Sequence, residues 1–118
     1  MNYPQLFQGC AYFIMLHTLI WFSANGQFMK NSDFFEKHSL LFAVLAGPII
    51  GVLGYYGARY VYAALSQSAW AVRFVGFGLS YLVFPLLTWY LLGETMFTIK
   101  TLACIALSFL IILIQVYF

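Results

Sequence analysis

Charged side chains are scarce in this chain. Lysine, arginine, aspartate and glutamate together make up 7% of its 118 residues, whereas 64% are hydrophobic. A soluble globular domain carries about 25% charged residues, so this composition excludes a domain that covers its whole surface with water-compatible side chains. The net charge of +2 is small and its charges are dispersed, unlike the clustered basic surface of a nucleic-acid-binding protein. We therefore expect no nucleic-acid partner.

Residue combinations that carry out chemistry are also missing. The sequence contains no paired carboxylates, no cysteine and histidine at catalytic spacing, and no phosphate-binding loop. Its two cysteines, Cys10 and Cys104, lie inside apolar runs, which favours small buried side chains over a disulfide. We accordingly expect neither an enzyme nor a metal site.

Long apolar runs fill the chain instead. About 20 apolar residues at ~1.5 Å per residue cross the ~30 Å hydrocarbon core of a bilayer. The sequence therefore predicts an all-α integral membrane protein whose residues 1–118 form one domain of four transmembrane helices with short loops. We expect its location to be a bacterial inner membrane. The predicted helices cover about residues 6–23, 39–65, 68–92 and 98–118.

Local signals set these boundaries. Pro4 suits the first turn of a helix, because proline needs no amide partner there, and Asn25-Gly26 is typical of a helix end. Residues 30–38 hold most of the charge, so we predict a solvated loop with a short interfacial turn. Ser39 is the expected N-cap of the second helix, and Gly93-Glu94-Thr95 is the expected turn before the fourth.

Small residues line one face of the second predicted helix, with spacings of four, four, three and four: Ala43, Gly47, Gly51, Gly54 and Ala58. Such a face lets another helix approach closely in lipid. We therefore predict a packing or dimer contact there. Pro48 lies in the same helix and should kink it, because proline removes one backbone hydrogen bond.

The fourth predicted helix carries a weakly polar stripe made up of Thr101, Cys104, Ser108 and Gln115. We expect this helix to pack the dimer, with Ser108 in the contact.

Short turns between the later helices make consecutive helices antiparallel, so both termini should lie on one side of the membrane. Arg59 and Arg73 lie nearer that side, and Lys30, Lys37 and Lys100 lie on the other. Positive charge normally fixes orientation, but here the two sides differ by one residue. The count fits a fixed orientation with the lysine side in the cytoplasm, and it also fits dual topology.

His17 is the only ionisable side chain in the first predicted helix apart from tyrosine and cysteine. Ionisable residues within a membrane are candidates for function, so His17 is a candidate proton relay or a ligand for a metal, haem or pigment. The interpretation that we favour is a neutral histidine hydrogen-bonded to a neighbouring helix, since one histidine does not make a metal site.

Arg59 and Arg73 each lie about one helical turn inside the membrane from the same short turn. Together they could form a basic vestibule that attracts a phosphate or carboxylate. The alternative, which we favour, is that both side chains reach out to interfacial phosphates. Arg73 shares a predicted helix face with Gly76 and Ser80. Four tyrosines lie near Arg59: Tyr55, Tyr56, Tyr60 and Tyr62. The candidate substrate-binding residues are therefore Arg59, Arg73, Tyr56, Ser80 and His17.

The segments GYYGARY (residues 54–60), AALS (63–66) and LLGET (91–95), with Pro85 between them, resemble the repeat unit of the drug/metabolite transporter superfamily. The likeness to its EamA-like members covers roughly residues 47–118. Four spans in so short a chain also resemble the small multidrug resistance branch, whose members act as antiparallel homodimers. In size the chain is similar to small subunits that flip amino-sugar-modified lipid carriers.

One departure from that branch concerns its coupling group. Members carry a membrane-embedded glutamate in the first helix, shared by protons and cationic drugs, whereas the corresponding stretch here reads GCAYFIMLH (residues 9–17). The resemblance therefore supports the fold better than it supports cation export. Arg59 and Arg73 suit an anionic or amphipathic substrate.

Three functions are consistent with the sequence. The leading expectation is a small, dimeric transporter or flippase subunit of drug/metabolite type. The second is a non-catalytic accessory subunit that packs against other membrane subunits in a larger complex. The third is a subunit that contacts haem or pigment through His17.

Overall fold

The computed structural model describes residues 2–30 and 32–117. The described residues form helices and short connections with no strand, and four of the helices are long and apolar enough to cross a membrane. The elements in chain order are α1 (Tyr3–Asn25), the 3₁₀ turn η1 (Gly26–Phe28), α2 (Asp33–Ala64), α3 (Ala69–Leu87), the π-helical turn η2 (Thr88–Leu92) and α4 (Ile99–Tyr117).

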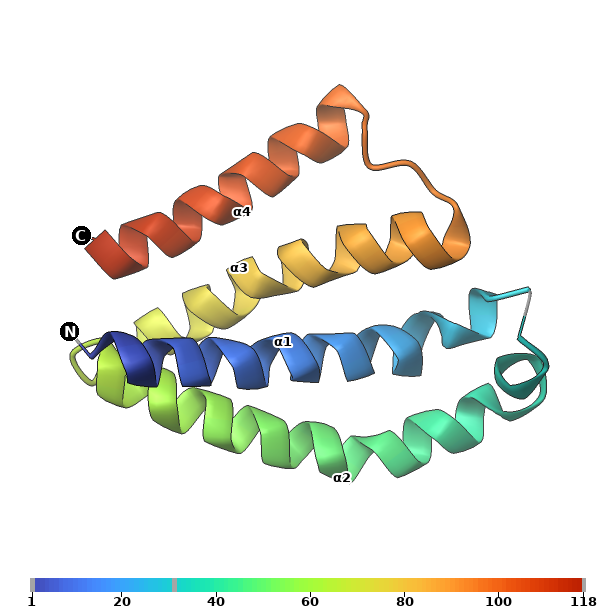
Figure 1. The fold of residues 1–118 in the computed structure, drawn as a ribbon, viewed down its shortest axis with the longest axis horizontal. Coiled ribbons are helices and arrows are strands. Elements are labelled where there is room, and N and C mark those ends of the chain that lie inside the picture. Colours follow the sequence, from blue (N-terminus) through green and yellow to red (C-terminus); the bar gives the residue numbers. More distant parts are fainter. Residues whose placement is uncertain (1, 31, 118) are drawn as a thin grey trace.

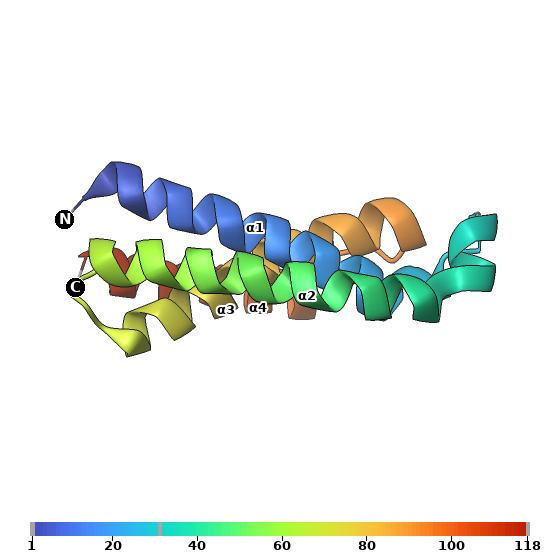
Figure 2. The same cartoon turned by 90° about the horizontal axis from the view of Figure 1, so that it is seen from below.

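The helices form a flat array rather than a rounded bundle. The backbone extends over 45 × 36 × 19 Å, so the array is less than half as thick as it is long. Figure 1 shows α4, α3, α1 and α2 following one another across the array, and Figure 2 shows its thin edge. The start of α1 and the end of α4 lie with the α2–α3 turn at one end of the molecule (Figure 1), as predicted.

The first helix begins earlier than predicted. It starts at Tyr3 rather than near Leu6, because the Asn2 side chain caps it by accepting a hydrogen bond from the Gln5 backbone N–H at 3.2 Å. Pro4 lies in the first turn, as expected. The predicted break at Asn25-Gly26 is confirmed, since α1 ends at Asn25 and η1 follows.

The predicted solvated loop over residues 30–38 is wrong for most of its length. The helix α2 already starts at Asp33, and Ser39 is not its N-cap. The backbone leaves helical geometry at His38, however, with φ −126° and ψ 23°. The predicted boundary at Ser39 is therefore a break inside a helix, and a short helical turn precedes it.

Aromatic packing explains why this charged segment is helical. The Phe35 ring stacks on Phe22 of α1 at a centroid distance of 5.5 Å and meets Phe42 edge-on at 5.1 Å. Asp33 and Glu36 lie in the first turn, where negative charge is favourable for a helix N-terminus. Apolar anchoring thus outweighs the polarity from which a loop was predicted.

The two prolines inside helices have different surroundings. Pro48 stands at the middle of α2, which bends along its length (Figure 1). Pro85 is buried in α3 and lies three residues before the π-helical turn η2, so the predicted helix over 68–92 changes form at its end. Gly93 ends it with a left-handed φ of 74°. The fourth helix agrees with prediction within one residue at its start, and Phe118 lies outside the described residues.

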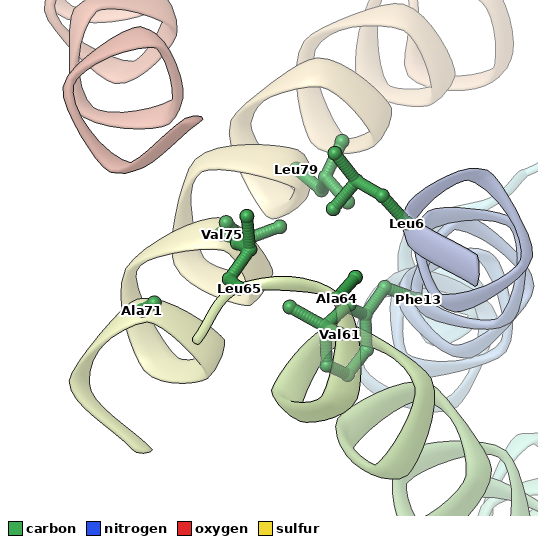
Figure 3. Packing of buried hydrophobic residues seen from close by; sticks show 8 residues of the cluster. All are labelled: Leu6, Phe13, Val61, Ala64, Leu65, Ala71, Val75 and Leu79. Atoms are coloured by element: carbon green, nitrogen blue, oxygen red, sulfur yellow. The ribbon is translucent and has the colours of Figure 1, made fainter. Parts of the chain in front are cut away.

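The hydrophobic core lies where α1, α2 and α3 meet, near the end that holds the chain termini. Figure 3 shows its eight buried members: Leu6, Phe13, Val61, Ala64, Leu65, Ala71, Val75 and Leu79. The α4 helix packs on α3, and only the edge residues Ile112 and Val116 join this core. Most of the surface of α4 is therefore left without a partner inside the chain.

Glycines permit the closest helix crossing, between α1 and α2. A Cβ atom at Gly9 would lie 2.5 Å from Val61 Cγ2 and 2.9 Å from the Val61 backbone nitrogen, and one at Gly57 would lie 2.8 Å from the Phe13 ring. Gly47, by contrast, has nothing within 4 Å of such an atom. Inside the chain, the crossing depends on Gly9 and Gly57 and not on Gly47.

This difference predicts the outcome of two matched substitutions. Gly9→Leu should destabilise the fold by about 1–3 kcal/mol or more, because the added side chain meets backbone that cannot move aside, while Gly47→Leu should leave the fold nearly unchanged. The measurement is the free energy of unfolding in mixed micelles, followed by helicity. Equal losses in the two variants would contradict the assigned crossing.

Candidate functional site

The candidate site consists of two adjoining hollows, one between α1, α2 and α3 and one between α2 and α3. The first, here called the His17 hollow, has a volume of about 400 Å³. One face of α1 and one face of α3 form most of its wall, which is made up of Phe13, Leu16, His17, Ile20, Ala58, Val72, Arg73, Gly76, Phe77 and Ser80. Three candidate residues predicted from the sequence therefore meet here: His17, Arg73 and Ser80.

His17 is held by a hydrogen bond between helices. Its Nε2 atom lies 2.8 Å from the Gly76 carbonyl oxygen. A carbonyl only accepts, so Nε2 must carry a proton and donate it, which leaves Nδ1 as the second polar atom of the ring. The hydrogen bond to a neighbouring helix that we expected for His17 is present. The bond fixes the ring at the wall of the hollow.

Ser80 and Arg73 occupy the α3 side of the same hollow. The Ser80 hydroxyl donates to the Phe77 carbonyl at 2.6 Å, so its oxygen keeps accepting capacity. The Arg73 side chain is exposed. The prediction that Arg73, Gly76 and Ser80 share one face is confirmed, since all three line this hollow.

Arg59 lies in a second hollow, here called the Arg59 hollow, of about 480 Å³. Its wall consists of Tyr55, Ala58, Arg59, Tyr62, Ala69 and Val72. Ala58 and Val72 belong to both hollows. The arginines therefore line two adjoining hollows separated by small and branched apolar side chains, where the sequence had suggested one shared vestibule.

Tyr56 takes a different position from the one predicted. Its ring stacks on Tyr12 of α1 at 5.8 Å, and Tyr60 stacks on the same Tyr12 ring at 5.7 Å. The Arg59 hollow is lined by Tyr55 and Tyr62 instead. Successive helix positions point about 100° apart, so only two of the four tyrosines can face the hollow while the other two face α1.

The charge distribution leaves both arginines without acidic neighbours. No carboxylate from the described residues lines either hollow. Asp33 and Glu36 lie in the first turn of α2, and Glu94 lies in the connection between η2 and α4. A guanidinium group is always charged and offers five donors in a planar fork. The two hollows can therefore offer charge-assisted hydrogen bonds to an anion. Among the described residues, no cluster of histidine, cysteine and acidic side chains could hold a metal ion.

The predicted packing residues divide into three groups. Gly54 faces Leu16 of α1, and Ala58 packs at the edge of the core. Gly47 and Gly51 meet nothing within the chain, so their proposed contact with another chain stays a prediction. Ser108 is the one buried residue of α4, and it packs on α3 inside the chain, where a dimer contact was predicted.

The α3–α4 contact explains the position of Ser108. A Cβ atom at Gly78 would lie 2.5 Å from Ile112 and 3.1 Å from the Ser108 carbonyl oxygen. The Ser108 hydroxyl donates back to the Cys104 carbonyl at 2.9 Å, within its own helix. Ser108, one residue of the polar stripe of α4, therefore lies against α3.

A buried hydrogen bond that the sequence analysis missed joins the far end of the array. The indole N–H of Trp21 donates to the Thr88 hydroxyl at 2.9 Å, and both side chains are buried. It connects α1 to the π-helical turn η2. The one sequence signal available for this bond was a threonine at the point where a proline-containing helix ends.

No protein-family model matches this chain, and no curated protein or solved structure matches it significantly.

The His17 bond predicts a difference between two substitutions. His17→Leu removes the donor to Gly76 and should lower the free energy of unfolding by about 0.6–2 kcal/mol relative to His17→Gln, which keeps a donor. Unfolding in mixed micelles measures this difference. The matched control is His38, an exposed histidine, at which leucine and glutamine should be equivalent. A leucine variant at position 17 as stable as the glutamine variant would exclude a contribution of the bond to stability.

Proposed function

We propose that this chain is the subunit of a small transporter in a bacterial inner membrane, acting as a homodimer on a small anionic or amphipathic substrate. The observation that carries the proposal is the pair of adjoining hollows, in which Arg59 and Arg73 stand without a carboxylate partner between helices apolar enough to span a membrane. The resemblance to drug/metabolite transporters gives the same class, with transport as activity and two copies as the working unit.

The lining of the hollows supports an amphipathic anion. Around Arg73, most of the wall is apolar or aromatic, with His17 and Ser80 as the polar exceptions. A carboxylate or phosphate would bind the guanidinium through paired hydrogen bonds, while an apolar body would contact Phe13 and Phe77. Specificity in such a site comes from a few polar groups on an apolar wall.

The thinness of the chain supports a dimer. A molecule 19 Å thick has no room to enclose a substrate, and both hollows are open at the surface. A second copy placed over them would complete a central cavity, with alternating access produced by rocking of one half against the other. Most of α4 and the Gly47–Gly51 face of α2 are also without contacts inside the chain.

The same open surfaces support a second candidate. An accessory subunit of a larger complex also needs helix faces that other chains cover, and Gly47 and Gly51 provide a small-residue face for close approach. The two candidates differ in the arginines, because a subunit that only packs against others does not need a charged group in each hollow.

The arginine variants test the leading proposal. In proteoliposomes, Arg73→Gln and Arg59→Gln should each lower the apparent affinity for an anion such as benzoate or inorganic phosphate by about ten- to hundredfold, since a charge-assisted hydrogen bond is worth ~1.5–3 kcal/mol. Lysine should restore only part of the affinity, because it lacks the planar fork. Lys37→Gln, an exposed change at the opposite end, is the control.

If the arginines only reach out to lipid phosphates, lysine should substitute fully at both positions. Full activity in Arg59→Lys and Arg73→Lys, with altered orientation only in the glutamine variants, would therefore reject the anion site.

Association through α2 has its own test. Gly51→Leu should reduce crosslinking between copies in lipid, because a bulky side chain prevents close approach of backbones, while the stability of the separate chain should stay unchanged since that face is open. Ala63→Leu, which adds most of the same carbon atoms at an exposed position on another face of α2, controls for added volume. Crosslinking that is equal in the Gly51→Leu variant and the parent would remove Gly51 from the interface.

A further inference from the structure

The α3–α4 pair holds a third hollow that plays no part in the proposed transport. Its volume is about 260 Å³, and it lies where the two helices diverge toward the Gly93–Thr98 connection (Figure 1). The helices touch closely at the other end, where Gly78 meets Ile112. The result is a wedge, here called the α3–α4 wedge, that opens sideways toward the surroundings of the helices.

The wedge is charged near the connection and apolar farther along the helices. Tyr81, Phe84, Pro85 and Ile105 form the apolar part of its wall. Glu94 and Lys100 also line it, and both are exposed at the end where the helix-connecting turns lie. Thr95 and Thr101 add hydroxyl groups between these regions. The polarity thus changes along the wedge as it does along a phospholipid, from headgroup to acyl chain.

Contacts at its margins fix the walls of the wedge. On the α1 side, the bond from Trp21 to Thr88 fixes the π-helical turn that forms one wall. On the α4 side, the Thr98 hydroxyl caps the helix by accepting from the Thr101 backbone N–H at 3.2 Å. Trp89 and Phe97 meet edge-on at 5.4 Å and connect η2 to the segment leading into α4. The Trp89–Phe97 contact therefore ties the two walls together at the end where the connection lies.

We propose that the α3–α4 wedge binds one phospholipid with a primary-amine zwitterionic headgroup, of the phosphatidylethanolamine type. Lys100 pairs with the lipid phosphate, and Glu94 accepts hydrogen bonds from the lipid ammonium. One acyl chain lies along Phe84, Pro85 and Ile105. The charge pair selects the headgroup, since a choline headgroup has no N–H to donate to Glu94 and an anionic phosphatidylglycerol headgroup offers no cation.

The assignment depends on lipid chemistry and not on transport, so it holds whether the chain is a transporter or an accessory subunit. Glu94 also lines a neighbouring hollow with Lys30. This second lysine raises the alternative of an anionic lipid, which the experiment separates from the zwitterionic one.

The experiment uses the full chain in vesicles made mainly of phosphatidylethanolamine or mainly of phosphatidylcholine, with a trace of diazirine-labelled phosphatidylethanolamine. After illumination, mass spectrometry maps the labelled residues. We expect labelling to concentrate on Tyr81–Ile105, and unlabelled phosphatidylethanolamine to compete better than phosphatidylcholine or phosphatidylglycerol. Labelling spread evenly over all four helices, or equal competition by the three lipids, would overturn the proposal, and stronger competition by phosphatidylglycerol would replace it with an anionic-lipid site.

Matched variants locate the headgroup. Glu94→Gln and Lys100→Gln should each reduce wedge labelling by about two- to fivefold, the range expected for exposed charge pairs. Glu36→Gln and Lys37→Gln, exposed charges of the same kinds on α2, should not change it. Equal effects of the wedge variants and their controls would overturn the headgroup assignment.

A further pair locates the acyl chain. Ile105→Trp fills the wedge and should abolish the labelling, whereas Leu110→Trp, on an exposed part of α4, should not. Helicity and elution volume confirm that both variants fold. Undiminished labelling in folded Ile105→Trp would exclude the wedge as the site.

Discussion

The arrangement of this chain depends on the close crossing of α1 and α2 at Gly9 and Gly57. Because neither glycine has a side chain, Phe13 and Val61 fill the space between the helices and extend the contact into the core. The crossing places α1 beside α3 as well, so that His17 reaches the Gly76 carbonyl. The hollows with Arg59 and Arg73 lie beside this contact, and a shift of α1 would change the wall of the His17 hollow.

A second constraint is the lack of interior. Four helices in a slab 19 Å thick can bury few residues, and α4 contributes one buried side chain. Two polar side chains of α1, His17 and Trp21, find hydrogen-bond partners where α1 meets α3 and η2. Charged groups instead stay at open surfaces, where a substrate, a lipid or another chain can meet them.

The sequence predicted the helical class and the order of the elements well, because long apolar runs and the turn signals at Asn25 and Gly93 are local features. The prediction of a loop at Asp33 was wrong, because the helix there is held by contacts of Phe35 with Phe22 and Phe42. Phe22 belongs to another helix, and Phe42 lies outside the charged segment, so the local composition did not indicate either contact. The shared face of Arg73, Gly76 and Ser80 was predictable from helical periodicity. The position of His17 opposite this face could not be predicted, because the relative placement of α1 and α3 depends on contacts between residues distant in the chain.

The same limit applies to the glycines. Regular spacing drew attention to Gly47 and Gly51, yet the tight crossings inside the chain use Gly9, Gly57 and Gly78. Spacing identifies a face that can approach another helix, but which helix meets it depends on the whole fold. The unused face of α2 is accordingly part of the argument for a second chain.

The most direct test of the central claim is benzoate flux into vesicles that hold this purified chain alone, measured while the protein-to-lipid ratio is lowered step by step. The account predicts that a fraction of vesicles takes up the anion, and that this fraction falls with dilution as expected for pairs of chains rather than single ones. Vesicles that contain the folded chain and show no anion uptake at any ratio would contradict it.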